Sequence, residues 1–217
     1  EETTPAHYRE VFGTEMPTQL VDLKNGDCVY VDLDGDGVIT PDDMTRDLGF
    51  TDDPEYMAGL NLGFSWKNFD FSMQWTGAWN VSRSISSIFR RPFQDRNTSN
   101  QGGLLVAQVE NTWSPENPDP NAEYPRATID NAANNYADSN LWEKDAKYLR
   151  LKNLQIAYNF QFPLMEKLKL STCQLAFSGY NLLTFTPYKW GDPESRASSS
   201  PTYPLTRTFS LSLKLGF

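Results

Sequence analysis

The sequence predicts an all-β fold: an antiparallel up-and-down sheet that forms a segment of a transmembrane β-barrel and carries long external loops. Three observations support this prediction. Long segments alternate apolar residues with small or polar ones, their connections are alternately short and long, and their apolar positions hold many large aromatic side chains. No apolar run in the 217 residues approaches the roughly 20 residues that a membrane-spanning helix needs.

The clearest pair of strands lies near the first third of the chain. Residues 56–66, YMAGLNLGFSW, and residues 69–79, FDFSMQWTGAW, both alternate with period two. Only Lys67 and Asn68 separate them, which predicts a tight hairpin with Trp66 opposite Phe69. The apolar faces of the two strands then lie together.

Three further strands are predicted at residues 148–160, 172–183 and 208–217. In the first of these the apolar parity changes, from Leu149 and Leu151 to Leu154 and Ile156, which predicts a β-bulge near Lys152 and Asn153. Between the five strands, short connections alternate with long ones. Transmembrane barrels have short turns at one edge and long loops at the other.

The composition of the two faces indicates which of them is wet. In the first hairpin the polar positions are mostly glycine, serine, asparagine, glutamine, threonine and alanine, which suit a barrel interior, and aromatic residues gather at the strand ends as in interfacial girdles. Since five strands cannot close a barrel, the chain is expected to be part of a larger one. The residues predicted to face lipid are Leu60, Leu62, Phe64, Phe71, Met73, Trp75, Leu211, Leu213 and Leu215.

An acidic stretch, VDLDGDGVITPDD at residues 31–43, is spaced like a calcium-binding loop. Asp32, Asp34 and Asp36 would offer carboxylates and Val38 its carbonyl, and Asp43 closes the loop where glutamate is usual. The preceding NGDCVYV is predicted to be a strand, so the loop would stand alone. A structural calcium ion and an empty acidic turn are both compatible with this pattern.

A second interpretation of the same features is a secreted, calcium-stabilised β-sandwich that binds carbohydrate. Other functions find no support. The net charge of −9 argues against a nucleic-acid partner, and His7, the only histidine, cannot build a zinc site alone. No nucleophile or phosphate-binding motif is present, so an enzyme is not expected. Cys28 and Cys173 do not form a disulfide framework, and the first residues do not resemble a signal peptide.

Several ordered motifs together resemble the C-terminal part of SusC/RagA-type TonB-dependent outer-membrane transporters of Bacteroidetes-like bacteria. They are VYVDLDGDGVIT, the hairpin at residues 56–79, NTWSPENPDPNAEYPR, LWEKDAKYLRLKNLQIAYNF, LAFSGYNLLTFTPYKWGDPE and the terminal TFSLSLKLGF. The resemblance implies a bacterial outer-membrane location and about five strands of a 22-stranded barrel. Residues 1–55 would form an external loop region and residues 56–217 the last barrel strands and loops, with the plug domain outside this chain.

The same resemblance implies partners and cargo. It implies a nutrient importer of oligosaccharides or oligopeptides that works with a SusD-like surface lipoprotein and with the TonB complex through a missing N-terminal part. The alternation that ends at Phe217 is similar to the signal by which the barrel-assembly machinery recognises its substrates.

The resemblance also assigns sides to the connections and raises a question about the loop aromatics. Residues 80–147 and 184–207 are expected to be external, and residues 67–68 and 161–171 periplasmic. Six aromatic loop residues are expected either to stack on cargo or to build loop cores or a lipoprotein contact: Trp113, Tyr124, Tyr136, Trp142, Tyr188 and Trp190.

Overall fold

A computed structural model describes residues 5–93, 103–119, 121–128, 132–195 and 205–217. Parts of the two long predicted loops lie outside these ranges. The described residues divide into two compact units, one with residues up to 49 and 84–144, the other with residues 50–83, 145–195 and 205–217. Among the described helices, none has the length and apolar character required to cross a membrane. The predicted boundary after residue 55 stays a prediction.

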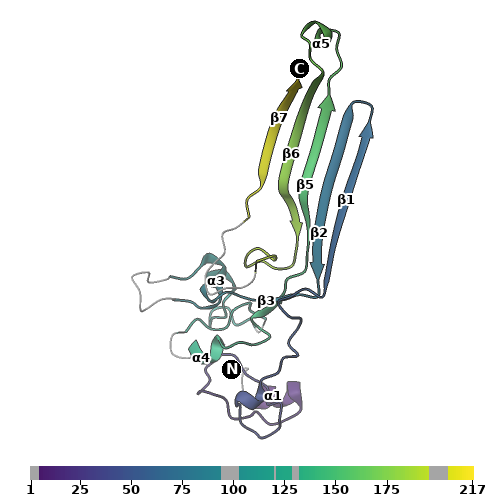
Figure 1. The fold of residues 1–217 in the computed structure, drawn as a ribbon. Helices are drawn as coiled ribbons and strands as arrows, with labels where there is room; N and C mark the ends of the chain where they lie inside the picture. The colour runs from purple at the N-terminus through teal and green to yellow at the C-terminus, as the bar shows by residue number, and fades with distance from the viewer. Residues whose placement is uncertain (1–4, 94–102, 120, 129–131, 196–204) are drawn as a thin grey trace. The chain divides into compact units, whose positions relative to one another are not determined.

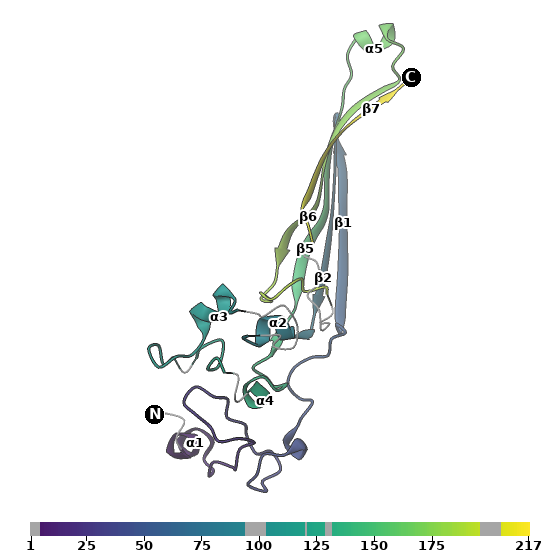
Figure 2. The ribbon, with the colours of Figure 1, turned by 90° about the vertical axis from the view of Figure 1, so that its left-hand side faces the viewer.

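The second unit contains a five-stranded antiparallel sheet with the order β1-β2-β5-β6-β7 (Figure 1). Its strands are β1 (Tyr56–Trp66), β2 (Phe69–Trp79), β5 (Tyr148–Asn159), β6 (Thr172–Phe185) and β7 (Thr208–Gly216). Each strand pairs with the next one along the chain. Figure 2 shows the strands from the side as a single layer, and no second sheet of the described residues packs on them. The predicted fold class is therefore confirmed, as an open segment.

The first hairpin has the register that the alternation predicts. Trp66 lies opposite Phe69 and Tyr56 opposite Trp79, so all eleven residues of β1 have a partner in β2. Lys67, the first residue of the turn, has a φ of 52°. A positive φ at this position suits the right-handed twist of the two strands.

Two irregularities change the pairing near the middle of the sheet. The register between β2 and β5 shifts between Leu151 and Asn153, which confirms the predicted bulge at Lys152. The register between β5 and β6 also shifts, since Leu151 pairs with Leu183 whereas Asn153 pairs with Tyr180. Asn181, inside this second irregularity, has a φ of 53°, a conformation that asparagine tolerates well. The two bulges keep the apolar side chains on one face along the whole length of β5 and β6.

The remaining elements are short. They are α1 (Pro5–Phe12), the 3-10 helix η1 (Pro41–Asp43), β3 (Ser82–Ser84), α2 (Ser87–Arg90), α3 (Val106–Asn111), α4 (Ala132–Asn135), β4 (Glu143–Asp145) and α5 (Leu164–Lys167). Strands β3 and β4 form a two-stranded sheet.

The first unit is held together by an aromatic cluster and a buried polar network. Tyr124 and Tyr136 both lie 5.9 Å from Trp142, measured between ring centroids, and all three residues are buried. Gly26 packs so closely on Trp113 that a Cβ atom at this position would lie 2.1 Å from the indole ring. The chain therefore needs glycine here for two reasons, the contact and a φ of 84°.

The predicted strand at NGDCVYV is wrong, since residues 25–31 form a turn and extended backbone without a strand partner in the described residues. Side chains hold this segment instead. The Asn135 Oδ1 accepts a hydrogen bond from the Cys28 backbone N–H at 3.0 Å, and Gln19 pairs with the backbone of Tyr30 in both directions. Alternation alone did not reveal that side-chain partners would replace a sheet partner.

Candidate functional site

Strand register divides the sheet into an apolar face and a polar face. The polar face consists of the residues on the same side as Ser72 and Gln74 of β2, and it continues through all five strands. Its members include Asn61 and Ser65 of β1, Asp70 and Thr76 of β2, Arg150, Asn153, Gln155 and Asn159 of β5, Gln174, Ser178, Tyr180 and Thr184 of β6, and Ser210, Ser212 and Lys214 of β7. This face matches the predicted barrel interior.

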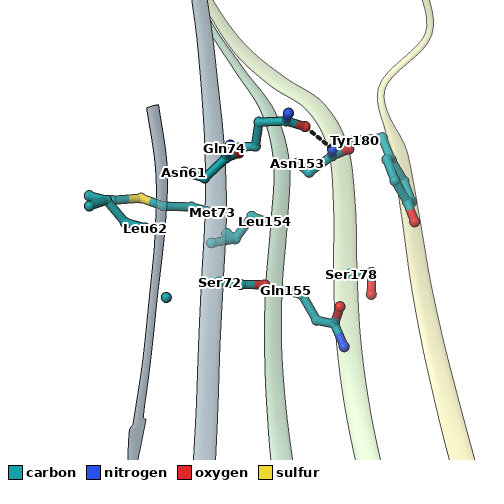
Figure 3. Close-up of a pocket in the computed structure, with 11 residues that line it drawn as sticks. Asn61, Leu62, Ser72, Met73, Gln74, Asn153, Leu154, Gln155, Ser178 and Tyr180 are labelled. Carbon is teal, nitrogen blue, oxygen red and sulfur yellow. Dashed lines mark hydrogen bonds between the residues drawn. The ribbon is translucent and has the colours of Figure 1, made fainter. Parts of the chain in front are cut away.

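A shallow hollow of about 480 Å³ lies over the middle of the polar face (Figure 3). Its polar side chains come from four strands: Asn61, Ser72, Gln74, Asn153, Gln155, Ser178 and Tyr180. Gln74 and Asn153 are hydrogen-bonded across β2 and β5 (Figure 3). All of these groups are neutral amides and hydroxyls, so the hollow offers hydrogen-bond donors and acceptors without a fixed charge.

Nearer to the short turns, side chains on the polar face are linked by hydrogen bonds across four strands. Asp70 accepts hydrogen bonds from the Ser65 hydroxyl at 2.6 Å and from the Asn159 amide at 2.7 Å. The Gln174 amide donates in turn to the Asn159 Oδ1 at 2.9 Å. The Asp70 carboxylate thus has two hydrogen-bond donors, one from β1 and one from β5.

The apolar face contains every residue that the sequence predicts to contact lipid. On the outer strands β1 and β7 these side chains are exposed, with 61% for Phe64 and 72% for Leu211. On β2, Phe71, Met73 and Trp75 are half-buried between neighbours on the same face. Phe64 stacks on Phe71 with 5.0 Å between ring centroids, and Phe177 stacks on Phe209 at 6.1 Å. A continuous exposed face of this kind is unusual in a water-soluble protein.

At the opposite end from the short turns, Arg150 fixes residues 186–195 to the sheet. Its guanidinium, 2% exposed, donates to both oxygens of Asp192, at 2.9 and 2.8 Å, and to Glu194 at 2.9 Å. Its Nε also donates to the Thr184 hydroxyl at 3.1 Å. A second buried arginine, Arg83, makes a separate contact, because its NH1 donates to the backbone carbonyl of Asp52 at 2.8 Å.

Apolar contacts support the same segment. Tyr188, from residues 186–195, packs with Val81 and Ala146, and Trp190 covers this cluster. The Tyr188 and Trp190 rings meet edge to face at 5.6 Å. The sequence did not indicate this role for Arg150, because its carboxylate partners lie more than 40 positions away, and only the fold brings them together.

The acidic loop brings three of its predicted ligands together. One carboxylate oxygen from each of Asp32, Asp34 and Asp36 lies within 4.8 Å of the others. The Asp32 oxygens accept hydrogen bonds from the backbone N–H groups of Gly35 and Gly37, at 2.6 and 2.8 Å. Asp34 and Asp36 each accept one from the residue two positions on. The loop thus folds around its own carboxylates, and oxygens remain for a hard cation.

Asp43 has a different role from the other acids. Its Oδ1 accepts from the Leu33 N–H at 2.7 Å, and its Oδ2 accepts from the Thr40 N–H at 2.7 Å as part of the capping box of η1. The hydrogen bond from the Thr40 N–H, and to a smaller extent that from the Leu33 N–H, lowers the pKa of Asp43. Asp43 thus caps η1 and closes the loop, and like Asp32 it accepts backbone hydrogen bonds through both carboxylate oxygens. The backbone of Val38 is held by a bridge to Thr18.

The carboxylate of Asp34 is repelled by the other acidic side chains of the loop. The Asp36 N–H lowers its pKa, but desolvation and the charges of Asp36, Asp43 and Asp32 outweigh this effect, so that the pKa of Asp34 is raised. A divalent cation would relieve this repulsion. The three carboxylates therefore fit calcium chemically, and Asp32, Asp34 and Asp36 are the residues that would hold it.

Most of the loop aromatics are buried. Tyr124, Tyr136, Trp142 and Tyr188 are each less than a tenth exposed, and the Trp142 indole donates to the Asn135 carbonyl at 3.0 Å. Of the three expected roles, cargo stacking, loop cores and a lipoprotein contact, burial in a core is the one that the structure shows for these four residues.

The buried polar network of the first unit also lay outside the sequence predictions. Arg126 pairs with Asp27 at 2.9 Å, and the Asn135 amide donates to Asp27 at 2.8 Å. Burial, reinforced by the charge of Asp27, raises the pKa of the Cys28 thiol to about 12. Cys28 and Cys173 are both free thiols. The network is structural, because its members are hydrogen-bonded to one another.

A single-layer antiparallel sheet with one exposed apolar face and one polar face defines a class of protein: a segment of a β-barrel wall. Comparison with known proteins narrows this class. The chain is 29% identical over 209 residues to the TonB-dependent receptor P3 of Formosa agariphila, with 90% of the chain covered. It is 26% identical over 204 residues to the TonB-dependent receptor P26 of the same bacterium. No family model matches the chain.

Comparison with solved structures gives a result consistent with these sequence matches. The fold matches a structure of the RagAB peptide transporter with a TM-score of 0.59 and 22% identity, over 83% of this chain and 19% of that one. The chain also spans only about a fifth of the length of the curated relatives, 19% and 20%. These matches confirm the predicted resemblance to the SusC/RagA type of TonB-dependent transporter. The proteins that the chain resembles are receptors and transporters rather than enzymes.

Proposed function

We propose that this chain forms part of the barrel wall of a TonB-dependent importer in the bacterial outer membrane. The observation that carries the proposal is the apolar face, which runs unbroken across five strands, is not covered by a second layer of described residues, and has a polar face behind it. Such a sheet suits hydrocarbon on one side and an aqueous lumen on the other. The similarity to TonB-dependent receptors supports the same conclusion.

The proposal includes partners and cargo. The importer would act with a SusD-like surface lipoprotein and the TonB complex. It would be inserted by the barrel-assembly machinery through β7 and the Phe217 that follows it, and it would carry oligosaccharides or oligopeptides. The matched RagAB structures are described as a peptide transporter and a peptide importer, which supports the peptide alternative. The neutral amides of the polar face suit either cargo.

Transport by the full-length protein tests the proposal. Cells that carry its gene should take up labelled oligopeptides or oligosaccharides, and deletion of the gene or dissipation of the proton gradient should abolish this uptake. A tagged protein should be recovered from the outer membrane together with a surface lipoprotein. Uptake that persists after deletion, or recovery of the protein from the soluble fraction, would contradict the proposal.

The alternative of a soluble carbohydrate-binding β-sandwich makes a different prediction for the 217-residue chain. A sandwich buries its apolar face against a second sheet, whereas Leu62, Phe64 and Leu211 are exposed. We therefore expect the isolated chain to need detergent to remain in solution. A monomeric, detergent-free chain that binds oligosaccharide would favour the sandwich.

We also propose that the acidic loop binds calcium as a structural ion. Terbium should bind the full-length protein and be displaced by calcium, and Asp34→Asn should weaken binding because it removes one of the three carboxylates. Asp42→Asn is the matched control, since Asp42 is exposed and lies outside the trio. Calcium affinity should decrease as the pH is lowered and Asp34 becomes protonated. Because the pKa of Asp34 is raised, this loss should set in above pH 3.8, the usual pKa of an aspartate. Equal binding by both variants would exclude the site.

A further inference from the structure

The strand ends that the short turns connect form a continuous surface. We call it the short-turn edge and define it as residues 66–69, 159–171 and 216–217. Two backbone hydrogen bonds join its parts. The Asn159 N–H donates to the Asn68 carbonyl at 2.8 Å, and the Ser171 N–H donates to the Gly216 carbonyl at 2.8 Å. The turn between β1 and β2, the connection that contains α5, and the end of β7 therefore follow one another along this short-turn edge (Figure 1).

Apolar side chains are exposed along this edge. Trp66 and Phe69 begin the series on the first hairpin, and beside this edge the half-buried rings of Tyr158 and Phe160 meet edge to face at 4.8 Å between ring centroids. Beyond them, Phe162, Leu164 and Leu168 are exposed in the α5 connection, and Phe217 is 88% exposed. This belt continues the apolar face of the strands. Aromatic residues in such a position are typical of a membrane interface.

The charge of the edge is opposite to that of the whole chain. The sequence carries a net charge of −9, yet the edge has three exposed lysines, Lys67, Lys167 and Lys169, and one acidic side chain, that of Glu166. The Lys67 ammonium lies 4.7 Å from the centroid of the Trp66 ring. This cation–π contact holds the charge at the level of the aromatic belt.

Two of the three lysines occupy positions that favour glycine. Lys67 has a φ of 52° at the first position of a two-residue turn. Lys169 has a φ of 54° just after α5, where the N–H groups of Lys169 and Leu170 donate to the carbonyls of Glu166 and Met165. This hydrogen-bond pattern is a Schellman motif, whose left-handed residue is usually glycine. Lysine is conformationally unfavourable at both positions, so backbone geometry does not explain its presence.

We propose that the short-turn edge binds anionic phospholipids in preference to zwitterionic ones in the leaflet that it meets. This inference rests on the proposed function, because the short turns of such a barrel lie at the periplasmic side of the membrane. Apolar side chains there insert beside the acyl chains, and Lys67, Lys167 and Lys169 lie at the depth of the phosphates. Basic residues next to an apolar anchor bind anionic lipid more strongly than zwitterionic lipid.

Native mass spectrometry of the delipidated full-length protein tests this proposal with phosphatidylglycerol and phosphatidylethanolamine as probes. Each nearby lysine favours an anionic surface about fivefold, so the wild-type protein, with three lysines, should prefer phosphatidylglycerol over phosphatidylethanolamine by well over fivefold. The double variant Lys67→Asn/Lys169→Asn should reduce this preference to about fivefold or less, the share of Lys167 alone. Asparagine tolerates the left-handed conformation, so the turns should remain intact.

Two further variants separate charge from structure. Lys67→Arg/Lys169→Arg should keep the preference, because it retains both charges. Lys147→Gln/Lys189→Gln removes two exposed lysines from the other end of the strands and should also leave the preference unchanged. A wild-type protein without preference, or an asparagine variant that keeps it, would overturn the inference.

The same samples distinguish this failure from failure of the proposed function. The protein should be recovered from the outer membrane, and it should run as a compact, heat-modifiable species on an electrophoresis gel. If it does so without preferring phosphatidylglycerol, the lipid site is wrong and the importer stands. If it does not reach the outer membrane, both proposals fail.

Discussion

At the scale of single residues, Arg150 shows why a charge is buried on the polar face. A guanidinium at 2% exposure is stable only with partners, and Asp192, Glu194 and Thr184 supply them. The interaction fixes residues 186–195, which sequence patterning treats as an unstructured connection. The charged network thus determines where this segment lies on its own unit.

Substitution of Arg150 by methionine should release this segment. In the full-length protein we expect Arg150→Met to cost about 3 kcal/mol of stability, because it leaves Asp192 and Glu194 without their partner. Trypsin should also cleave faster after Lys189, which is exposed within the segment. Arg207→Met, at an exposed position, serves as the control.

The triple variant Arg150→Met/Asp192→Asn/Glu194→Gln should recover part of the lost stability, since it removes the unpaired charges together. If Arg150→Met were as stable and as resistant to trypsin as the wild-type protein, the ion pairs would not be what holds the segment.

Two glycines of the first hairpin provide a test of packing at single residues. A Cβ on Gly77 would lie 2.7 Å from the Trp79 ring and 2.9 Å from the Tyr148 carbonyl, whereas one on Gly63 would meet the Phe71 carbonyl at 3.5 Å. Gly77→Ala should therefore destabilise the full-length barrel by about 1 to 3 kcal/mol. Gly63→Ala should be neutral or slightly stabilising. Thermal unfolding in detergent measures both, and equal effects would contradict the packing described for Gly77.

At the scale of elements, alternation was sufficient to predict most of the sheet. The bounds of β1 and β2 follow directly from it, and the change of parity at Lys152 revealed the bulge in β5. The bulge in β6 was not predicted, because the apolar residues on either side of the stretch from Tyr180 to Leu183 keep the same alternation. The turn at residues 25–31 was mistaken for a strand because alternating residues can be held by side chains from distant positions, here Asn135.

The candidate site was less predictable than the fold. Local spacing identified Asp32, Asp34 and Asp36, which the structure brings together. The capping role of Asp43 depends on its backbone partners at Leu33 and Thr40, which the spacing does not specify. The partners of Arg150 and Asp70 are set by tertiary structure and strand register. Sequence patterns reveal these only after the register is known.

The two faces of β7 make opposite predictions for neighbouring residues. Leu213→Arg in the full-length protein puts a charge on the apolar face and should destabilise the barrel by about 2 to 4 kcal/mol if that position is near the bilayer centre. Ser212→Arg places the same side chain on the polar face and should have a much smaller effect. Refolding into lipid vesicles at graded denaturant measures the difference. Equal costs would contradict the assignment of the faces.

At the scale of the whole molecule, the sheet has two open edges, β1 and β7, and no second sheet of the described residues packs on it. Unpaired strand edges are costly in a membrane, so the rest of a barrel must supply their partners. The chain covers about a fifth of the receptors that it resembles, which agrees with this requirement. Its stability is therefore a property of the complete barrel, and variants are best compared in the full-length protein.

Spin labels along β7 test the central claim that the apolar face contacts lipid. Single cysteines at residues 209–215 of the full-length protein would be labelled in reconstituted membranes, with Cys173 replaced by alanine. Cys28 should stay unlabelled near neutral pH, because the pKa of its thiol is about 12. Residues 209, 211, 213 and 215 should be accessible to oxygen dissolved in lipid, and residues 210, 212 and 214 to a water-soluble nickel reagent. Labels at the odd positions that neither reagent reaches would show that protein covers this face, which would contradict the account.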